Sequence, residues 1–535
     1  MPINRRQFLL GAAATGGAMI VARPGGALAA PLDVGTLDVS RVSRLFPDGR
    51  LVHGDLHNHT VRSDGGGNPA LAFASMRTAG LDFAALTDHS TVSKVAGAAG
   101  VCVDASCAGL GINETSWQEA AALANTANSD DSFTAIRGFE WSSPQLGHIN
   151  VWFSTTWVDP LSTGGVDASA GTAQFLHDGG VPFQPGQEAV LQQILAASQT
   201  QGAGILGFQT WLKSPPSQPG LGGGADSIAG FNHPGREPGR YGNFAFDPAL
   251  RGRMVSIEVF NRGEDYLFEG VDSGVQSPIQ QCLNAGWTPG LAGVTDEHGQ
   301  AWGTPQNNGR TGIFVSTLSR GGVRAGMESR RFFAARLRGL RIDAAANGVP
   351  MGGTLAHTSG PVTFALDVDR GVSWHGRQLQ VQVLQSGRAG ELLPRVVRSL
   401  TVTVPTPSEP VITFDVPISR TDGRWLVLRV SDPASTDLNP GSGNKKIEED
   451  ARARGTAYAG LGPAIAYASP FYLADGAPTA VVPEAPAAVL LPAAAALGMG
   501  AAYVAARAHG HGDGHDHGPG DSHDHEAGHP HGTPA

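Results

Sequence analysis

The chain has 535 residues and a formal net charge of −10. This length is sufficient for two or more domains, each with its own core, and an acidic chain in which no basic patch stands out argues against a nucleic-acid partner. Of the three cysteines, Cys102 and Cys107 can close a small loop in an oxidising compartment, which leaves Cys282 single. None of them lies in a metal-binding spacing, so we assign them no chemistry.

Residues 1–30 have the features of an export signal. Arg5 and Arg6 precede a weakly apolar stretch rich in Ala and Gly, which ends in an Ala-x-Ala pattern at 27–29. We expect a twin-arginine (Tat) signal that the Tat translocase reads and that is removed on export. An ordinary Sec signal, or a fortuitous arginine pair, is the alternative. Because the Tat route carries folded proteins, any cofactor would be loaded before translocation.

Residues of the types that commonly bind metals recur in motifs between positions 57 and 298. A His-x-His pair on an extended segment places both imidazoles on one face, because side chains alternate with period two. Histidines mixed with carboxylates in this ratio suit Zn, Mn or Fe better than Mg or Ca, which prefer oxygen ligands alone. The candidate ligands are His57, His59, Asp64, His89, Glu140, His148, His233, Asp296 and His298.

Short apolar runs precede most of these ligands. The runs are 83–87, 134–139, 227–231 and 289–294, and each has the length and composition of a buried strand. Open α/β sheets and α/β barrels place their sites just beyond the C-terminal ends of such strands. We therefore expect an α/β domain whose strand ends converge on one metal site.

These motifs resemble those of the PHP (polymerase and histidinol phosphatase) superfamily, from Gly-Asp-Leu-His-x-His-Thr at 54–60 to the late Asp-x-His at 296–298. The resemblance covers residues 50–345 and implies a distorted seven-stranded (β/α) barrel with two or three divalent metal ions. By the pattern of that superfamily, the first metal takes His57, His59, Glu140 and Asp296, the second Glu140, His148 and His233, and the third Asp64, His89 and His298.

Further motifs resemble those of the CehA/McbA branch of metallohydrolases. They lie at 309–314, 329–334, 351–353 and 466–470. The likeness implies a C-terminal β-sandwich and a group of enzymes that includes hydrolases of aryl carbamates.

The pattern changes to period-two alternation beyond the first domain. Runs at 362–366, 379–383, 400–404, 411–414 and 425–430 are separated by Pro, Gly and Asp turns. Such runs predict an antiparallel β-sandwich over 355–475. We find no catalytic motif in this region, and expect it to cover one face of the barrel or to shape its entrance.

The C-terminal segment contains an uncharged stretch at 485–506, between Glu484 and Arg507. Its length and flanking charges suit a transmembrane helix that holds the mature protein at the membrane after export. Its many Ala residues and two prolines leave a disordered linker as the alternative. Eight histidines follow in the tail at 507–535, and such tracts bind metals loosely without folding. This tail either buffers metal or is merely solvated.

Clustered divalent ions would activate water for hydrolysis, with Glu140, Asp296 and His298 as the central catalytic residues. The resemblance to the PHP superfamily favours phosphoesters as substrates, and Arg236, Arg262 and Arg310, together with Arg240, could contact the anion. A neutral ester, amide or carbamate, held in a pocket lined by Trp141, Trp211 and Trp302, is the alternative. A third hypothesis is a non-catalytic cell-surface protein that only binds metal.

Overall fold

The structure is a computed structural model of the chain. It describes residues 40–90, 111–143, 146–160, 162–164, 204–303, 309–356, 360–419, 422–434, 458 and 462–474. The predicted export signal, Cys102, Cys107, the apolar segment 485–506 and the histidine-rich tail lie outside these residues. Among the helices inside them, none combines the length and apolar character that a membrane crossing requires.

The first part of the chain mixes strands with helices. Its strands are β1 (Arg50–Asp55), β2 (Phe83–Leu86), β3 (Thr134–Ser143), β4 (Gly147–Trp152), β5 (Ile228–Phe231), β6 (Met254–Asn261), β7 (Glu264–Asp265) and β8 (Gly290–Val294). Its helices are α2 (Pro69–Thr78), α4 (Glu114–Ala127), α7 (Gly204–Lys213), α8 (Arg240–Phe244) and α9 (Pro278–Ala285), with short 3₁₀ turns at Pro248–Leu250, Tyr266–Phe268 and Val271–Ser273.

Local sequence sets where several helices begin and end. The Asn68 side chain caps α2, whose first residue is Pro69, and a proline suits that position because it needs no amide hydrogen there. Helix α4 begins with a reciprocal capping box between Asn113 and Ser116. Helix α9 ends at Gly286, whose φ of 109° is a left-handed conformation that favours glycine.

The segment labelled α8 differs from an ordinary helix. Arg240, Tyr241, Asn243 and Phe244 have φ between 41° and 60°, so the segment is a left-handed turn that costs L-residues energy. The turn is held in place because Tyr241 is fully buried, its amide donates to Leu146 O, and its hydroxyl donates to Asn232 O.

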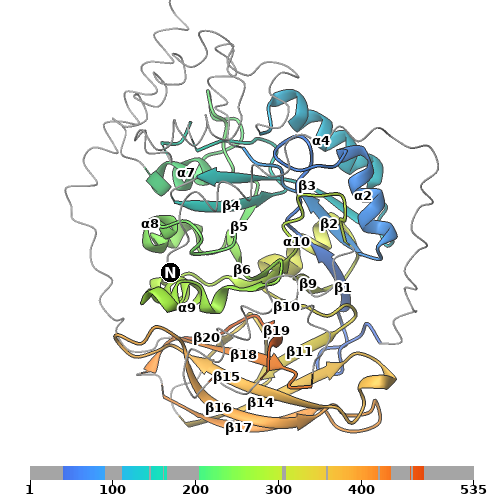
Figure 1. Cartoon of the computed structure of the whole chain (residues 1–535), viewed down its shortest axis with the longest axis vertical. Helices are drawn as coiled ribbons and strands as arrows, with labels where there is room; N and C mark the ends of the chain where they lie inside the picture. Colours follow the sequence, from blue (N-terminus) through green and yellow to red (C-terminus); the bar gives the residue numbers. More distant parts are fainter. Residues whose placement is uncertain are drawn as a thin grey trace, which may run out of the picture.

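The predicted apolar runs form buried strands of one large sheet. Strands β1, β2 and β3 are parallel neighbours, β4 is antiparallel to β3 and β5, and β6 is parallel to both β5 and β8. Helices α2 and α4 lie on one side of these strands, and α7 and α9 lie on the other (Figure 1). The protein is therefore a mixed α/β structure with a large sheet.

The expected closed seven-stranded barrel is not formed by a continuous backbone ladder. The strand path is open, because β8 pairs with β6 only, while the next strand, β9 (Arg310–Val315), pairs with β1. Between β8 and β9, the Thr311 hydroxyl donates to Gly293 O at 2.8 Å and lies 3.2 Å from Gly293 N, from which it accepts. A side chain thus occupies the seam where closure would require backbone pairing.

The remaining elements complete this sheet and add a second one. They are α10 (Arg320–Glu328), β10 (Phe332–Ala335), β11 (Arg341–Ala346), β12 (Val349–Pro350), β13 (Thr354–Leu355), β14 (Gly360–Asp369), a 3₁₀ turn at Val372–Trp374, β15 (Gln378–Gln385), β16 (Arg395–Thr403), β17 (Ile412–Ile418), β18 (Trp425–Ser431), β19 (Ala464–Ala468) and β20 (Phe471–Leu473).

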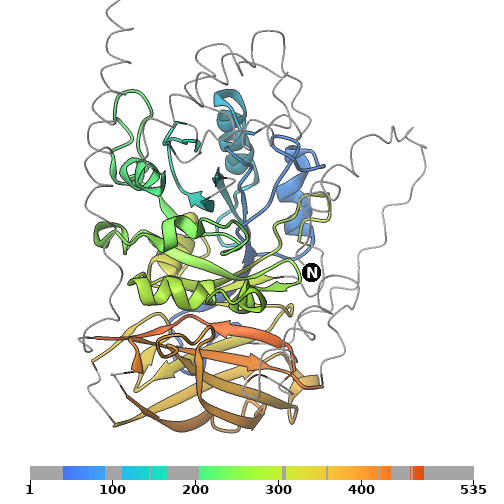
Figure 2. The ribbon, with the colours of Figure 1, turned by 60° about the vertical axis from the view of Figure 1, so that its left-hand side comes forward.

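The predicted period-two runs form antiparallel strands, but they do not make a self-contained sandwich. Strand β10 pairs with both β9 and β19, so the large sheet continues into β18, β15 and β16. Strands β12, β11, β14 and β17 form a separate four-stranded sheet. One apolar cluster joins residues of both sheets, including Phe364, Val381 and Leu428. Figures 1 and 2 show these strands gathered at one end of the molecule.

Candidate metal centre

The predicted ligands arise mostly at strand ends. His89 follows β2, His233 follows β5, and Asp296 and His298 follow β8, as the apolar runs predicted. His57 and His59 follow β1, for which no run was predicted. Glu140 and His148 instead lie within β3 and β4. Strand β3 extends past the predicted end of its run because it pairs with β4, which places Ser142 opposite His148.

A buried carboxylate fixes the loop that carries His59 and Asp64. Asp88 accepts hydrogen bonds from Thr60 N at 2.6 Å and from Ser63 Oγ at 2.8 Å. Since Asp88 immediately precedes His89, these bonds tie the first and second ligand segments together. The sequence suggested Asp88 only as part of a motif, and the structure gives it a positioning role.

Around Glu140, the ligands expected for the first metal lie close together. His57 Nε2 is 3.0 Å from His59 Nε2 and 3.2 Å from Glu140 Oε1. Asp296 Oδ1 is 3.4 Å from His57 Nε2 and 3.2 Å from His59 Nε2. Two atoms that each lie about 2.0–2.2 Å from one ion are separated by about 3.0–3.6 Å, so this donor set fits a shared metal ion.

The other predicted ligands form groups beside this one. Asp64 Oδ1 lies 3.4 Å from His89 Nε2 and 3.3 Å from His298 Nε2. On the opposite side of Glu140, its Oε1 lies 3.2 Å from His148 Nδ1 and 3.3 Å from His233 Nε2. The groups able to hold an ion are His59/Asp64/His89/His298, His57/His59/Glu140, His89/Glu140/His148 and His148/His233/Glu237. The structure thus brings every predicted ligand together and adds Glu237.

Burial and mutual charge govern the protonation of these residues. Burial alone would lower the pKa of His57, but the carboxylates of Asp296, Glu140 and Glu258 raise it well above its ordinary value. Burial opposes ionisation of Glu140 as well, yet the neighbouring histidines hold its pKa well below the usual range. Burial lowers the pKa of His59, and His298 and His89 lower it further. Glu140 is therefore ionised and His59 neutral, which are the forms in which these side chains bind metals, whereas His57 holds a proton that it would release on binding an ion.

Glu258, on β6, is a site residue that the sequence reading missed. Its Oε1 lies 2.8 Å from His57 Nδ1, and its Oε2 accepts hydrogen bonds from His233 N at 2.6 Å and from Asn261 Nδ2 at 2.8 Å. A carboxylate on the far nitrogen of a ligand histidine fixes its tautomer and ring orientation. The sequence feature that could have pointed to Glu258 is its position as a single acidic residue inside the apolar segment that forms β6.

Two of the predicted substrate-binding arginines reach the site. Arg262 and Arg236 place a guanidinium nitrogen 3.3 Å and 3.6 Å from Asp296 Oδ2. Arg262 is half exposed, with 48% of its side chain accessible, whereas Arg236 also donates to the Tyr266 hydroxyl at 3.1 Å. Both can therefore donate to an anion beside Asp296.

The other predicted contact residues have different surroundings. Arg310 is buried beside Asp55 and donates to Gly303 O at 2.7 Å, and burial lowers its pKa to about 10. Arg240 donates to Gln276 O at 2.6 Å and holds the loop before α9. These contacts give both arginines a role in fixing the local structure.

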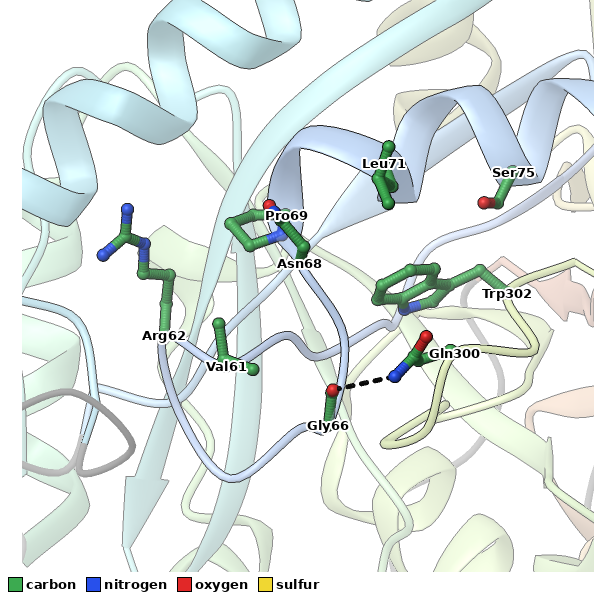
Figure 3. A pocket seen from close by; sticks show the side chains of 9 residues that line it. All are labelled: Val61, Arg62, Gly66, Asn68, Pro69, Leu71, Ser75, Gln300 and Trp302. Carbon is green, nitrogen blue, oxygen red and sulfur yellow. Dashed lines mark hydrogen bonds between the residues drawn. The ribbon is translucent and has the colours of Figure 1, made fainter. Parts of the chain in front are cut away.

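The three tryptophans predicted to line one pocket lie in two different places. Trp141 and Trp211 are buried in the apolar core with Phe208. Only Trp302 lines a cavity, which has a volume of about 500 Å³. Its indole donates to His59 O at 3.0 Å, so it also supports the ligand loop. Figure 3 shows the lining residues, which are Val61, Arg62, Gly66, Asn68, Pro69, Leu71, Ser75, Gln300 and Trp302.

Unusual backbone conformations occur at the site. His233, Arg262 and Asp296 have φ of 25°, 52° and 49°. Such conformations cost non-glycine residues on the order of 1–3 kcal/mol each and tend to cluster at functional sites. At His233, the strained residue is held by the hydrogen bond from its amide to Glu258, so the backbone as well as the side chain is positioned.

Comparison with known proteins gives no match to a family model and none to a curated protein. Among solved structures, the chain is similar to a two-domain protein from Bacteroides vulgatus containing a predicted PHP-like metal-dependent phosphoesterase (17% identity, 72% of this chain and 91% of that chain, TM-score 0.30). It is also similar to a protein from Bifidobacterium adolescentis named as a metal-dependent phosphoesterase (14% identity, 46% of this chain and 88% of that chain, TM-score 0.24). A third similar structure is an amidohydrolase from Chromobacterium violaceum (18% identity, 53% of this chain and 97% of that chain, TM-score 0.22).

The TM-scores of these structures lie between 0.22 and 0.30, so the likeness carries no argument about the activity of this chain. The resemblance to the PHP superfamily rests on the ordered sequence motifs, and the side chains that carry them converge around Glu140.

Proposed function

We propose that this protein is a metal-dependent hydrolase that acts on phosphoesters through two or three divalent ions of Zn, Mn or Fe. The observation that carries the proposal is the convergence of histidines and carboxylates around the fully buried Glu140. Asp296 Oδ2, which faces Arg262 and Arg236, and His233 Nδ1, which faces Glu237, are buried there without a hydrogen bond. Because unsatisfied buried polar atoms are costly, these atoms fit a site built for cations.

Bound ions would supply Lewis acidity and lower the pKa of water towards neutrality. The chain's own residues provide the remaining functions. Glu258 orients His57, while Arg262 and Arg236 offer guanidinium donors to an anionic oxygen beside Asp296. We assign the central catalytic positions to Glu140, Asp296 and His298, because these residues link neighbouring ligand groups. The arginine pair favours an anionic phosphoester over a neutral substrate.

A carbamate, ester or amide is the second candidate, and the cavity at Trp302 favours it. Val61, Leu71 and Pro69 give this cavity apolar walls, and Gly66 N donates to His298 O at 2.6 Å, which links its wall to a ligand segment. An aryl group bound there would lie beside the Asp64 loop.

We extend the proposal to the CehA/McbA branch on the placement of its motifs. The segments 309–314, 329–334 and 466–470 lie on or beside β9, β10 and β19, which are neighbours in the sheet. The 351–353 turn joins them through a hydrogen bond from Gly352 N to Pro470 O at 3.1 Å. These motifs form the joint between the two parts of the molecule, so they bear on architecture more than on substrate.

The deciding experiment measures metal content together with two activities. Protein folded with Zn and Mn available should carry two or three metal ions per chain by elemental analysis. It should hydrolyse p-nitrophenyl phosphate faster than a naphthyl carbamate, and a chelator should remove the activity. A preference for the carbamate would select the second candidate. One metal or none would overturn the proposed centre, and bound metal without either activity would leave the non-catalytic metal-binding protein as the remaining hypothesis.

A further inference from the structure

Glu237 lies four residues after His233, and its carboxylate faces both histidines of the β4–β5 side. Its Oε2 is 3.6 Å from His233 Nδ1, and its Oε1 is 4.0 Å from His148 Nε2. The same two rings turn their other nitrogens towards Glu140, at 3.3 Å for His233 Nε2 and 3.2 Å for His148 Nδ1. The two imidazoles therefore stand between two carboxylates.

The separations on the Glu237 side are those of ligands around an ion. Both distances exceed the usual upper limit of a hydrogen bond, which is about 3.2 Å. The shorter one matches the separation of about 3.3–3.6 Å between two atoms bound to one tetrahedral metal ion. The 4.0 Å separation needs only a small movement of His148, which lies less deeply buried than its partners.

The atoms at this position also lack other partners. His233 Nδ1 and Glu237 Oε2 are both buried without a hydrogen bond, and only 8% of Glu237 is exposed. A carboxylate removed from water is destabilising unless it is paired or coordinates a metal. A cation between Glu237 and the two rings would satisfy both atoms at once.

We propose that Glu237 is a direct ligand of the ion held by His148 and His233. The inference deepens the proposed metal-dependent hydrolase and rests on it. Two imidazoles and one carboxylate form a donor set that suits Zn, Mn or Fe, and three protein ligands leave a coordination position open for water or substrate. On this arrangement His148 and His233 serve the Glu237 side in place of the Glu140 side, and His57, His59 and Glu140 would remain for another ion.

Cobalt titration of the metal-free protein tests this role. Glu237→Gln keeps the size and one acceptor oxygen of the side chain but removes its charge. We expect this variant to bind one Co²⁺ fewer than the unaltered protein at micromolar Co²⁺, by elemental analysis after gel filtration. The affinity for that ion should fall by more than ~100-fold, because removal of an outer partner of a ligand histidine costs only about 10–100-fold. The visible Co²⁺ spectrum should lose the corresponding contribution.

Glu269→Gln is the matched control. This substitution removes the same charge from the same region, because the Glu269 side chain lies near Gly235. Glu269 does not belong to the ligand group. This variant should bind Co²⁺ like the unaltered protein. If Glu237→Gln does not fold, as judged by circular dichroism, Glu237→Asp serves in its place, and it should retain the ion with weakened affinity.

The outcomes separate this inference from the proposed function. An affinity for that ion in Glu237→Gln within about 100-fold of the unaltered protein overturns the ligand role while the hydrolase proposal stands. An equal loss of Co²⁺ in Glu269→Gln overturns it too, because the effect would then be one of general charge. Failure of the unaltered protein to bind any Co²⁺ would overturn both proposals.

Discussion

At the scale of single residues, the site is organised by buried carboxylates of different kinds. Glu140 lies between ligand groups and faces His57, His89, His148 and His233. Glu258 contacts Nδ1 of His57 and accepts a hydrogen bond from the backbone amide of His233. The first carboxylate can bind ions, and the second can only position the groups that bind them.

Glu140→Gln should lower kcat by more than ~100-fold, a loss on the scale reported for single groups that stabilise charge. The amide has the same shape but lacks the charge that neighbouring ions would require. Steady-state kinetics and metal analysis measure the effect, and circular dichroism should show an unchanged fold. Glu119→Gln is the control, because Glu119 pairs with Arg62 at the surface. Near-normal turnover in Glu140→Gln would rule out the bridging role.

Arg262→Ala should reduce kcat/KM for p-nitrophenyl phosphate by about 10–100-fold, which corresponds to a charged hydrogen bond of roughly 1.5–3 kcal/mol. Arg262→Lys should recover part of the loss, because it keeps the charge but not the planar fork. Arg324→Ala removes an arginine paired with Glu328 and should have no effect. A loss of equal size with a neutral carbamate would show that Arg262 acts by holding Asp296 and not by binding an anion.

At the scale of elements, the seam between β8 and β9 is the point where sequence expectation and structure differ. The two strands lie close enough for a Cβ at Gly293 to come within 2.6 Å of Arg310 O. They are joined by the Thr311 hydroxyl instead of by a backbone ladder. Since Asp296 follows β8 and β9 pairs with β1, this side chain links β8 to the neighbour of the strand that His57 and His59 follow.

Thr311→Val should destabilise the protein by about 1–3 kcal/mol, because it leaves buried polar groups of Gly293 without this partner at almost unchanged volume. The midpoint of urea unfolding measures the effect. Thr401→Val, at an exposed position of β16, should change stability by less than about 0.5 kcal/mol. Equal midpoints for the two variants would show that Thr311 does not stabilise the seam.

At the scale of the whole molecule, the two parts of the chain share one sheet through β10 and β19. The buried Tyr467 hydroxyl donates to Asp265 Oδ2 at 2.9 Å and reaches across the joint. The last described strand, β20, pairs with β13 and β18, so it is integral to the fold. Removal of the residues beyond 475 therefore cuts none of the described strands.

Truncation after Asp475 should move the protein from the membrane pellet to the soluble exported fraction with its hydrolytic activity retained. The reason is the uncharged segment 485–506, which we propose as a membrane anchor behind a Tat signal. Cell fractionation measures the change, and substitution of Arg5 and Arg6 by Lys should keep the full-length protein in the cytoplasm. A full-length protein that is already soluble after export would exclude the anchor.

The sequence by itself determined the ligand types, their order and the strands that deliver most of them. Apolar runs are local properties, so His89, His233 and Asp296 could be placed at strand ends before any fold was known, and alternation placed His57 and His59 on one face of an extended segment. The roles of Glu237 and Glu258 were decided only by tertiary structure, because single carboxylates acquire a function from groups distant in the chain. The same holds for the unclosed seam at Thr311 and for Arg310, which burial and a backbone partner remove from the site.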